Sequence, residues 1–184
     1  MKKTLSLVLA LTLCLSFASL AMAETFGLGV VSSIDSSSAA YVEDGDAYDG
    51  NAQVDTTICA LWLDDEGKII DVHFDVAQIK VPFSVEGALL TDENTDLRSK
   101  MEKGADYGML KASAIGKEWF EQVQAFEAYC VGKTVEEVLG MPTKALNEAH
   151  PTTPDVEELA TTCTMDIGAF LEALEKASND ACAR

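Results

Sequence analysis

The segment from Asn51 to Val76 limits the possible folds more than any other part of this chain. Residues 51–63 read as one long strand whose alternate side chains are apolar on both faces: Ile58, Ala60 and Trp62 on one, Cys59, Leu61 and Leu63 on the other. A strand of this kind is typical of the centre of a sheet. We therefore expect residues 51–63 to be central and to be covered on both sides.

A tight turn and a second strand follow directly. Asp64–Gly67 is a turn sequence, in which Gly67 can adopt a positive φ angle. The apolar residues Ile70, Val72, Phe74 and Val76 then alternate with Asp71, His73 and Asp75. This period of two predicts a strand with one buried face and one face in water, and so an antiparallel hairpin.

Strand patterns dominate the first half of the chain and helical patterns the second. Residues 26–34 read as a first strand, 35–50 as an acidic loop or wide connection, and 78–91 as weakly extended, with Pro82 indicating an edge or a loop. Helical spacing begins after Lys117 and ends at Gly132, and Thr134 with Glu137 forms a capping-box pattern. Asp166 is the expected N-cap of a last helix. This order predicts an α+β fold, an antiparallel sheet with helices packed on it, as a single domain over residues 24–184.

The first 23 residues have the pattern of a secretory signal peptide. A cationic start, Lys2-Lys3, precedes an apolar run from Thr4 to Leu20, and Ala21-Met22-Ala23 is a small-x-small cleavage sequence. We expect cleavage after Ala23 and a location outside the cytoplasm, in the cell envelope or secreted. No other apolar run has spanning length, so we expect no transmembrane segment after cleavage.

The charge balance narrows the range of partners. The chain has 31 acidic and 13 basic residues, a formal net charge of −18, and it becomes more negative once Lys2 and Lys3 are removed. Such a surface repels phosphate backbones and anionic lipids, which argues against nucleic-acid and membrane-surface partners. Glu43, Asp44, Asp46 and Asp49 lack the spacing of a calcium loop and indicate a solvated acidic loop.

Nothing in the sequence has the spacing of a catalytic or metal site. The only two histidines are His73, between two aspartates of a strand, and His150, in a loop, so we assign no metal ligand and no catalytic residue. Gly27-Leu28-Gly29 does not lead into a dinucleotide-binding helix, and we interpret it as strand flexibility.

Four cysteines follow the signal sequence: Cys59, Cys130, Cys163 and Cys182. Export permits disulfides, and four cysteines allow three full pairings. None forms a C-x-x-C pair, and each lies among apolar residues, so buried free thiols are the alternative. Pairing and oligomeric state remain open from the sequence.

One segment departs from the acidic character of the chain. Residues 98–117 contain five basic residues, Arg98, Lys100, Lys103, Lys111 and Lys117, together with three glycines and Tyr107. An anionic ligand entering an acidic protein needs a local group of cations of this kind. The alternative is that these side chains only neutralise neighbouring acids.

Two segments resemble the extracytoplasmic FMN-binding domain of flavin-carrying electron-transfer proteins. Tyr48-Asp49-Gly50, the following strand and Glu66-Gly67-Lys68-Ile69-Ile70 occur in the order found in that family, and Thr161-Thr162-Cys163-Thr164-Met165-Asp166 stands where it has S-G-A-T-x-[ST] before a helix. The resemblance implies that Thr164 occupies the place of the flavin-accepting threonine. Asp166 replaces a hydroxyl residue there, and its carboxylate repels an incoming phosphate. The stretch from Tyr107 to Trp119 also resembles uncharacterised exported proteins of anaerobic bacteria.

The sequence thus leads to two hypotheses. The first is an exported protein that binds a small anionic molecule, FMN in particular, without a covalent bond and in connection with extracytoplasmic electron transfer. Thr164, Lys100, Lys103, Tyr107, Lys111 and Lys117 are its candidate cofactor-binding residues. The alternative is a secreted or surface interaction protein with no cofactor. An enzyme is the least supported reading, because no acid, base and nucleophile set occurs at a recognisable spacing.

Overall fold

A four-stranded antiparallel sheet forms the base of the molecule. The structure, a computed structural model, describes residues 24–92, 94–148 and 150–183. The strands lie in the order β5 (Ile69–Phe83), β4 (Gly50–Leu63), β1 (Thr25–Ser33) and β8 (Cys182–Ala183). Every neighbouring pair is antiparallel. The signal sequence predicted over residues 1–23 lies outside the described residues.

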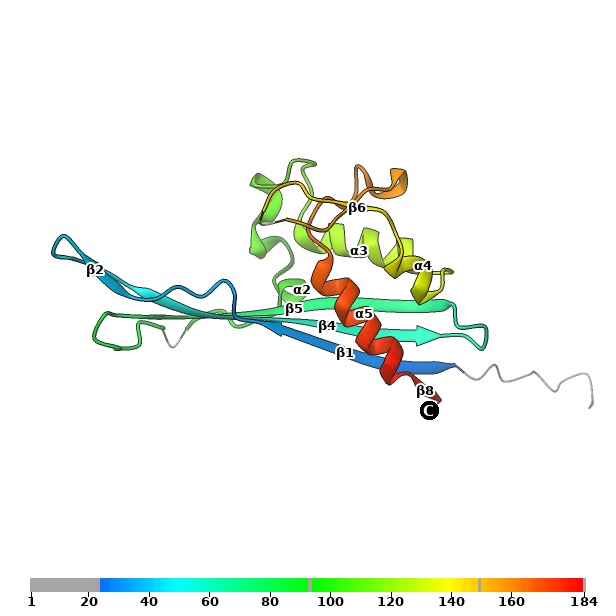
Figure 1. The fold of residues 1–184 in the computed structure, drawn as a ribbon, viewed down its shortest axis with the longest axis horizontal. Coiled ribbons are helices and arrows are strands. Elements are labelled where there is room, and N and C mark those ends of the chain that lie inside the picture. The colour runs from blue at the N-terminus through cyan, green and yellow to red at the C-terminus, as the bar shows by residue number, and fades with distance from the viewer. Residues whose placement is uncertain (1–23, 93, 149, 184) are drawn as a thin grey trace, which may run out of the picture.

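The helices lie on one side of this sheet (Figure 1). They are α2 (Lys100–Lys103), α3 (Trp119–Cys130), α4 (Val135–Leu139) and α5 (Gly168–Asp180), with 3-10 turns at Gly104–Tyr107, Met109–Lys111 and Glu157–Leu159. A small ribbon of β6 (Thr143–Lys144) and β7 (Thr153–Pro154) lies above them. The fold is therefore α+β, as the order of strands and helices predicted. No helix among the described residues combines the length and the apolar composition needed to cross a membrane.

The β4–β5 hairpin is longer than the rest of the sheet and extends beyond it as an arm (Figure 1). Its register runs from Leu63 opposite Ile69 to Gly50 opposite Phe83, so β5 continues well past the strand end expected near Val76. Pro82 is accommodated because β5 is an edge strand, where its missing N–H is not needed for the sheet. A small hairpin of β2 (Tyr41–Glu43) and β3 (Asp46–Tyr48) lies at the far end of the arm.

The core lies between the sheet and helices α3 and α5. The rings of Phe74, Phe126 and Phe170 form its centre, with centroids 5.0–6.2 Å apart. Helix α5 packs closely on β1 because that strand has glycines at its inward positions. A Cβ atom on Gly27 would lie 1.9 Å from the Ala177 carbonyl oxygen, and one on Gly29 would lie 1.8 Å from that of Ala173. The two glycines therefore permit helix–strand contact, rather than the strand flexibility we expected.

Two details of the hairpin differ from the prediction. Strand β4 is central, but helices cover only one of its faces, and Ile58, Ala60 and Trp62 on the other face are only partly buried. The register shifts between Trp62 and Leu63, so Ile69 instead of Ile70 enters the core, and Ile70 is 42% exposed. A bulge adds one residue to a strand and turns the following side chains over, which the alternation of apolar residues could not reveal.

The four described cysteines are free thiols. Cys59, Cys130 and Cys163 are buried in the core, and Cys182 is exposed in β8. Burial raises the pKa of Cys59 and of Cys130 to about 12, and that of Cys163 to about 11. The three core cysteines therefore behave as small hydrophobic residues.

Candidate functional site

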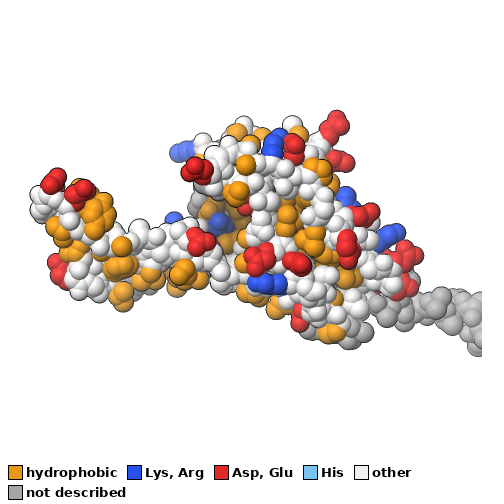
Figure 2. Space-filling view, in the orientation of Figure 1, with side chains coloured by type: hydrophobic (Ala, Val, Ile, Leu, Met, Phe, Trp, Pro, Cys, Tyr) orange, Lys and Arg blue, Asp and Glu red, His pale blue; other side chains and the backbone are white. Residues whose placement is uncertain are grey.

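A cleft of ≈ 420 Å³ lies where the arm leaves the body of the protein. Its floor is the inward face of β4 and β5, and its walls are α2, the start of α3, the loop at His150 and the first turn of α5. Figure 2 shows the hollow between the base of the arm and the helical layer. The residues that line it are Ser36, Gln53, Asp55, Thr57, Val76, Gln78, Lys100, Trp119, His150, Asp166, Ala169 and Phe170.

The floor of the cleft is polar because β4 changes character along its inward face. Cys59 and Leu61 point into the core, whereas the inward residues nearer the arm are Gln53, Asp55 and Thr57. The Asp55 carboxylate accepts hydrogen bonds from Gln53 Nε2 at 2.7 Å and from Gln78 Nε2 at 2.9 Å. The amides thus hold the carboxylate in place on the floor. We did not predict these residues, although three polar residues at inward positions of an apolar strand signal the end of the core.

At one wall a cation lies beside two aromatic rings, of which Trp119 lines the cleft and Tyr107 does not. Lys100 Nζ lies 5.0 Å from the centroid of the Tyr107 ring and 5.4 Å from that of Trp119. The two rings are themselves 6.2 Å apart in an edge arrangement. Helix α2 is fixed at this place by a capping box at Ser99 and by a hydrogen bond from the Met101 N–H to Asp75 Oδ1 at 3.1 Å. Lys100 and Tyr107, which the sequence suggested as ligand contacts, therefore form one cluster with Trp119.

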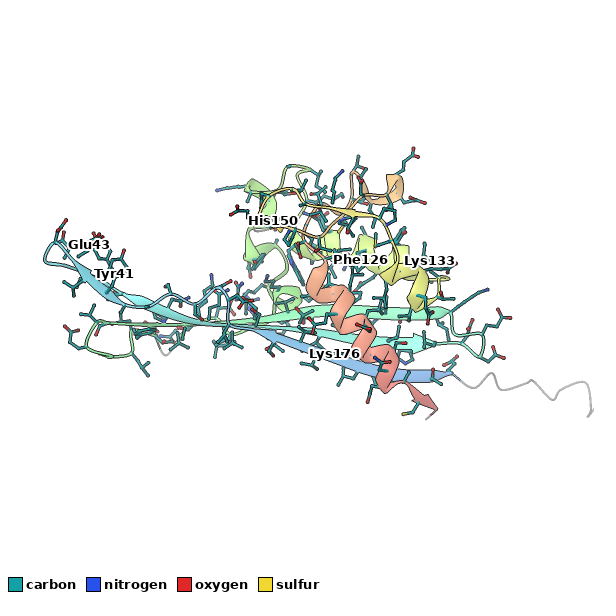
Figure 3. All side chains as sticks on the ribbon, viewed as in Figure 1. Tyr41, Glu43, Phe126, Lys133, His150 and Lys176 are labelled. Atoms are coloured by element: carbon teal, nitrogen blue, oxygen red, sulfur yellow. The ribbon has the colours of Figure 1, made fainter. Side chains whose placement is uncertain are left out.

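The opposite wall has a carboxylate and a histidine. Asp166 Oδ1 accepts a hydrogen bond from the Gly168 N–H at 2.9 Å, and Oδ2 accepts one from the Thr152 N–H at 2.7 Å. His150 is exposed at the mouth, with Nδ1 2.9 Å from Asn147 Oδ1 (Figure 3). The cleft thus contains a lysine, a histidine and two carboxylates. The lysine lies beside aromatic rings, and the other three groups have hydrogen-bond partners within the protein. Such a site suits a ligand with a ring and a few polar groups.

The other basic residues of residues 98–117 lie away from the cleft. Arg98 pairs with Asp96 at 2.9 Å and with Asp106 at 3.0 Å, which is the charge neutralisation weighed as the alternative. Lys111 is exposed, and Lys103 and Lys117 are half-buried. Lys103, Lys111 and Lys117 line none of the described hollows. The structure therefore brings one of the four candidate lysines, Lys100, to the cleft.

Thr164 lies on a different part of the surface. It lines a second hollow of ≈ 390 Å³ with Lys144 and Val156, and a smaller one of ≈ 200 Å³ that His150 also lines. Its backbone N–H donates to the buried Gln122 Oε1 at 3.0 Å. The Gly168 N–H at the start of α5, which could bind a phosphate, already binds Asp166. Thr164 therefore does not line the cleft at Lys100.

Among the described residues, no group of three or more His, Cys, Asp and Glu side chains is placed to hold a metal ion.

Part of the chain is similar to a curated protein. No protein-family model matches the chain, and no solved structure matches it. A chlorophenol reductase of Desulfitobacterium hafniense is 37% identical over 94 residues, which cover 45% of this chain and 28% of the relative. The chain thus matches less than a third of the length of that reductase.

Proposed function

We propose that this protein is an extracytoplasmic binding module whose cleft holds a planar, anionic small molecule, FMN in particular, in connection with electron transfer. The observation on which the proposal rests is the position of Lys100 Nζ, 5.0 Å and 5.4 Å from the centroids of the Tyr107 and Trp119 rings at the edge of a ≈ 420 Å³ cleft. A cation beside aromatic rings attracts a ligand that has both a ring and a negative group.

The size and lining of the cleft support this proposal. Ligand sites usually have volumes of about 300–1,000 Å³ and combine apolar walls with a few placed polar groups. Here Trp119 and Phe170 supply apolar surface, and Gln78 and Thr57 supply donors and acceptors. The isoalloxazine ring of a flavin has a hydrophobic plane and a polar edge, which corresponds to this arrangement.

The relative supports the redox part of the proposal. Its name states that it is a reductase of chlorophenol, and reduction requires a supply of electrons. Because the match covers 28% of that protein, we extend to this chain only the setting of electron transfer. An electron carrier such as FMN in the cleft is consistent with that setting.

Titration of the purified protein into FMN, followed by flavin fluorescence, tests the proposal. We expect the wild type to quench the fluorescence with a saturable dependence. Lys100→Met keeps the apolar stem and removes the charge, so it should weaken FMN binding by about tenfold or more. Lys103→Met is the matched control, because Lys103 is in the same short helix but does not line the cleft. It should leave binding unchanged.

Riboflavin separates the role of the phosphate from that of the ring. If Lys100 binds the phosphate, Lys100→Met should weaken FMN binding and leave riboflavin binding unchanged. If neither flavin is quenched by the wild type, the flavin proposal is wrong. The alternative hypothesis, an interaction protein without a cofactor, is supported by the uncovered face of the sheet.

A further inference from the structure

The face of the sheet opposite the helices, which we call the open face, is apolar over most of its length. Its three rows are Phe26, Leu28 and Val30 from β1, Val54, Thr56, Ile58, Ala60 and Trp62 from β4, and Asp71, His73, Asp75, Ala77 and Ile79 from β5. Leu28 is 47% and Val30 45% exposed. A contiguous apolar surface of this extent is unusual on a protein that acts alone and indicates an interaction site.

We propose that the open face is the interface of a homodimer, in which the sheets of two copies pack face to face. Two antiparallel sheets pack in this way in β-sandwiches, with their strands about 30° apart. Strand β4, apolar on both faces, has the sequence of a strand inside such a sandwich, and one of its two faces lacks a cover in the single chain.

The available area is sufficient for such a dimer. With about 3.3 Å per residue along a strand and 4.8 Å between strands, the full lengths of β1, β4 and β5, arm included, offer at most roughly 600 Å² of face on each copy. Two copies would then bury about 1,200 Å², which is the lower end of the range for specific interfaces. Trp62 packs on Phe26 at a centroid distance of 4.8 Å beside a hollow of ≈ 330 Å³. Tryptophan in such a place is typical of a strong contact in an interface.

Side chains occupy part of both edges of the sheet, which favours the face over the edges as the place for a second copy. On the outer edge of β5, the N–H groups of Val72, Phe74 and Val76 donate to carboxylates of Asp71, Glu127 and Asp75 at 2.7–2.9 Å. On the outer edge of β1, the Leu28 N–H donates to Asp180 Oδ2 at 3.0 Å, and Lys176 Nζ donates to the Val30 carbonyl at 3.4 Å. Blocked edges prevent pairing by strand addition.

The charges allow a second copy in one orientation. Within the three rows the acids are Asp71 and Asp75, both in the β5 row, and there is no Lys or Arg, while Glu24, just before β1, lines the hollow beside Phe26 and Trp62. A two-fold axis parallel to β4 lays the β5 row of one copy over the uncharged β1 row of the other, so these carboxylates do not face each other. The remaining repulsion between two acidic chains is long-range and is screened by salt. The dimer should therefore become tighter as the salt concentration rises.

Sedimentation velocity of the purified protein tests this inference. At about 100 µM we expect a dimer that dissociates on dilution, and an association at least threefold tighter at about 0.5 M than at about 0.05 M salt. Val30→Glu and Leu28→Glu place a charge in the β1 row of the open face and should weaken association at least tenfold. Val131→Glu is the matched control, because Val131 is 46% exposed on the helical side, after α3, and should leave association unchanged.

Three other results of this experiment would overturn the inference. A wild type that remains a monomer at both salt concentrations has no such interface, and this measurement needs no variant to fold. If salt weakens the dimer, charge attraction and not apolar contact holds the two copies together. Charge attraction of that kind would hold a basic partner instead. A dimer that Val30→Glu and Leu28→Glu leave intact, with native far-UV circular dichroism, uses another surface. Because the cleft lies on the helical side of the sheet, the flavin titration and this test can fail independently.

Discussion

Glu127 Oε1 accepts a hydrogen bond of 2.8 Å from the backbone N–H of Phe74, so a side chain of α3 completes the edge of strand β5. The carboxylate is almost fully buried, and His73 Nδ1 lies 3.8 Å from the same oxygen. Burial raises the pKa of Glu127 above its ordinary value of 4.5, although the Phe74 N–H and His73 act in the opposite direction.

The raised pKa of Glu127 predicts a pH-dependent stability. The native chain binds the proton more tightly than the unfolded chain, so this carboxyl's contribution to the free energy of unfolding falls as pH rises from about 4.5 through the native pKa. Glu127→Gln keeps an acceptor for Phe74 and removes this slope. Urea unfolding of both proteins from about pH 4 to pH 8 should show that the free energy of unfolding of the wild type falls relative to that of the variant as pH rises.

Glu136→Gln, on the exposed side of α4, is the control and should not change the slope. Glu127→Ala, in contrast, leaves the Phe74 N–H without its acceptor and should cost about 1–3 kcal/mol of stability. If the free energy of unfolding of the wild type instead rises relative to that of Glu127→Gln as pH rises, the pKa of Glu127 is not raised.

Gly29→Ala should destabilise the protein severely. The added Cβ would lie 1.8 Å from the Ala173 carbonyl oxygen, a backbone atom that cannot move without displacing α5. We expect a loss of at least about 3 kcal/mol in thermal or urea unfolding, or no folding at all. Ser32→Ala on the same strand loses only an exposed hydroxyl contact with Thr56 and should cost less than about 1 kcal/mol. Similar stabilities for the two variants would refute the close packing of α5 on β1.

Thiol titration should separate the cysteines by burial. The pKa values of about 12, 12 and 11 for Cys59, Cys130 and Cys163 leave almost no thiolate near pH 8. In the native chain from Glu24 onward, a chromogenic aromatic disulfide should therefore react rapidly with one thiol, that of Cys182. Unfolding in urea should expose the other three. Cys182→Ser should abolish the rapid phase, and any rapid phase that remains in that variant would show that a core cysteine is accessible.

The predicted export can be tested by mass. Expression in a host with a general secretory pathway should yield a chain that begins at Glu24, shorter by the first 23 residues. Ala23→Arg places a large charged residue at the cleavage site and should leave the precursor uncut. Detection of the uncut wild-type chain only in the cytoplasm would contradict the proposed location.

Elements defined by local chemistry were predictable from the sequence. The turn at Asp64–Gly67 and the capping box at Thr134 and Glu137 depend on residues a few positions apart, and both occur in the structure. The helix that ends at Gly132 is likewise confirmed as α3, Trp119–Cys130. The class α+β followed because strand and helix periods are separated along the chain.

Features that depend on distant contacts were not predictable. The pairing of β8 with Thr25 and Phe26 joins the two ends of the described chain, and no local pattern indicates it. The wall that Asp166 and His150 form opposite Lys100 arises only when the last third of the chain folds back over the sheet. For the same reason the basic residues near Lys100 appeared equivalent in the sequence, whereas the fold turns only Lys100 toward the cleft.

The contact between β1 and α5 suggests how distant homologues could be recognised. Gly27 and Gly29 are two positions apart in a strand, and Ala173 and Ala177 are four apart in a helix. The helix atom nearest to Gly27 is the Ala177 carbonyl oxygen, and the one nearest to Gly29 is the Ala173 carbonyl oxygen. Residues two apart in a strand share one face, and residues four apart in a helix share one face, so the two pairs can lie in contact. A side chain on either glycine would push the helix away. We expect a Gly-x-Gly near the start and an Ala-x-x-x-Ala near the end to persist together in sequences that have diverged everywhere else.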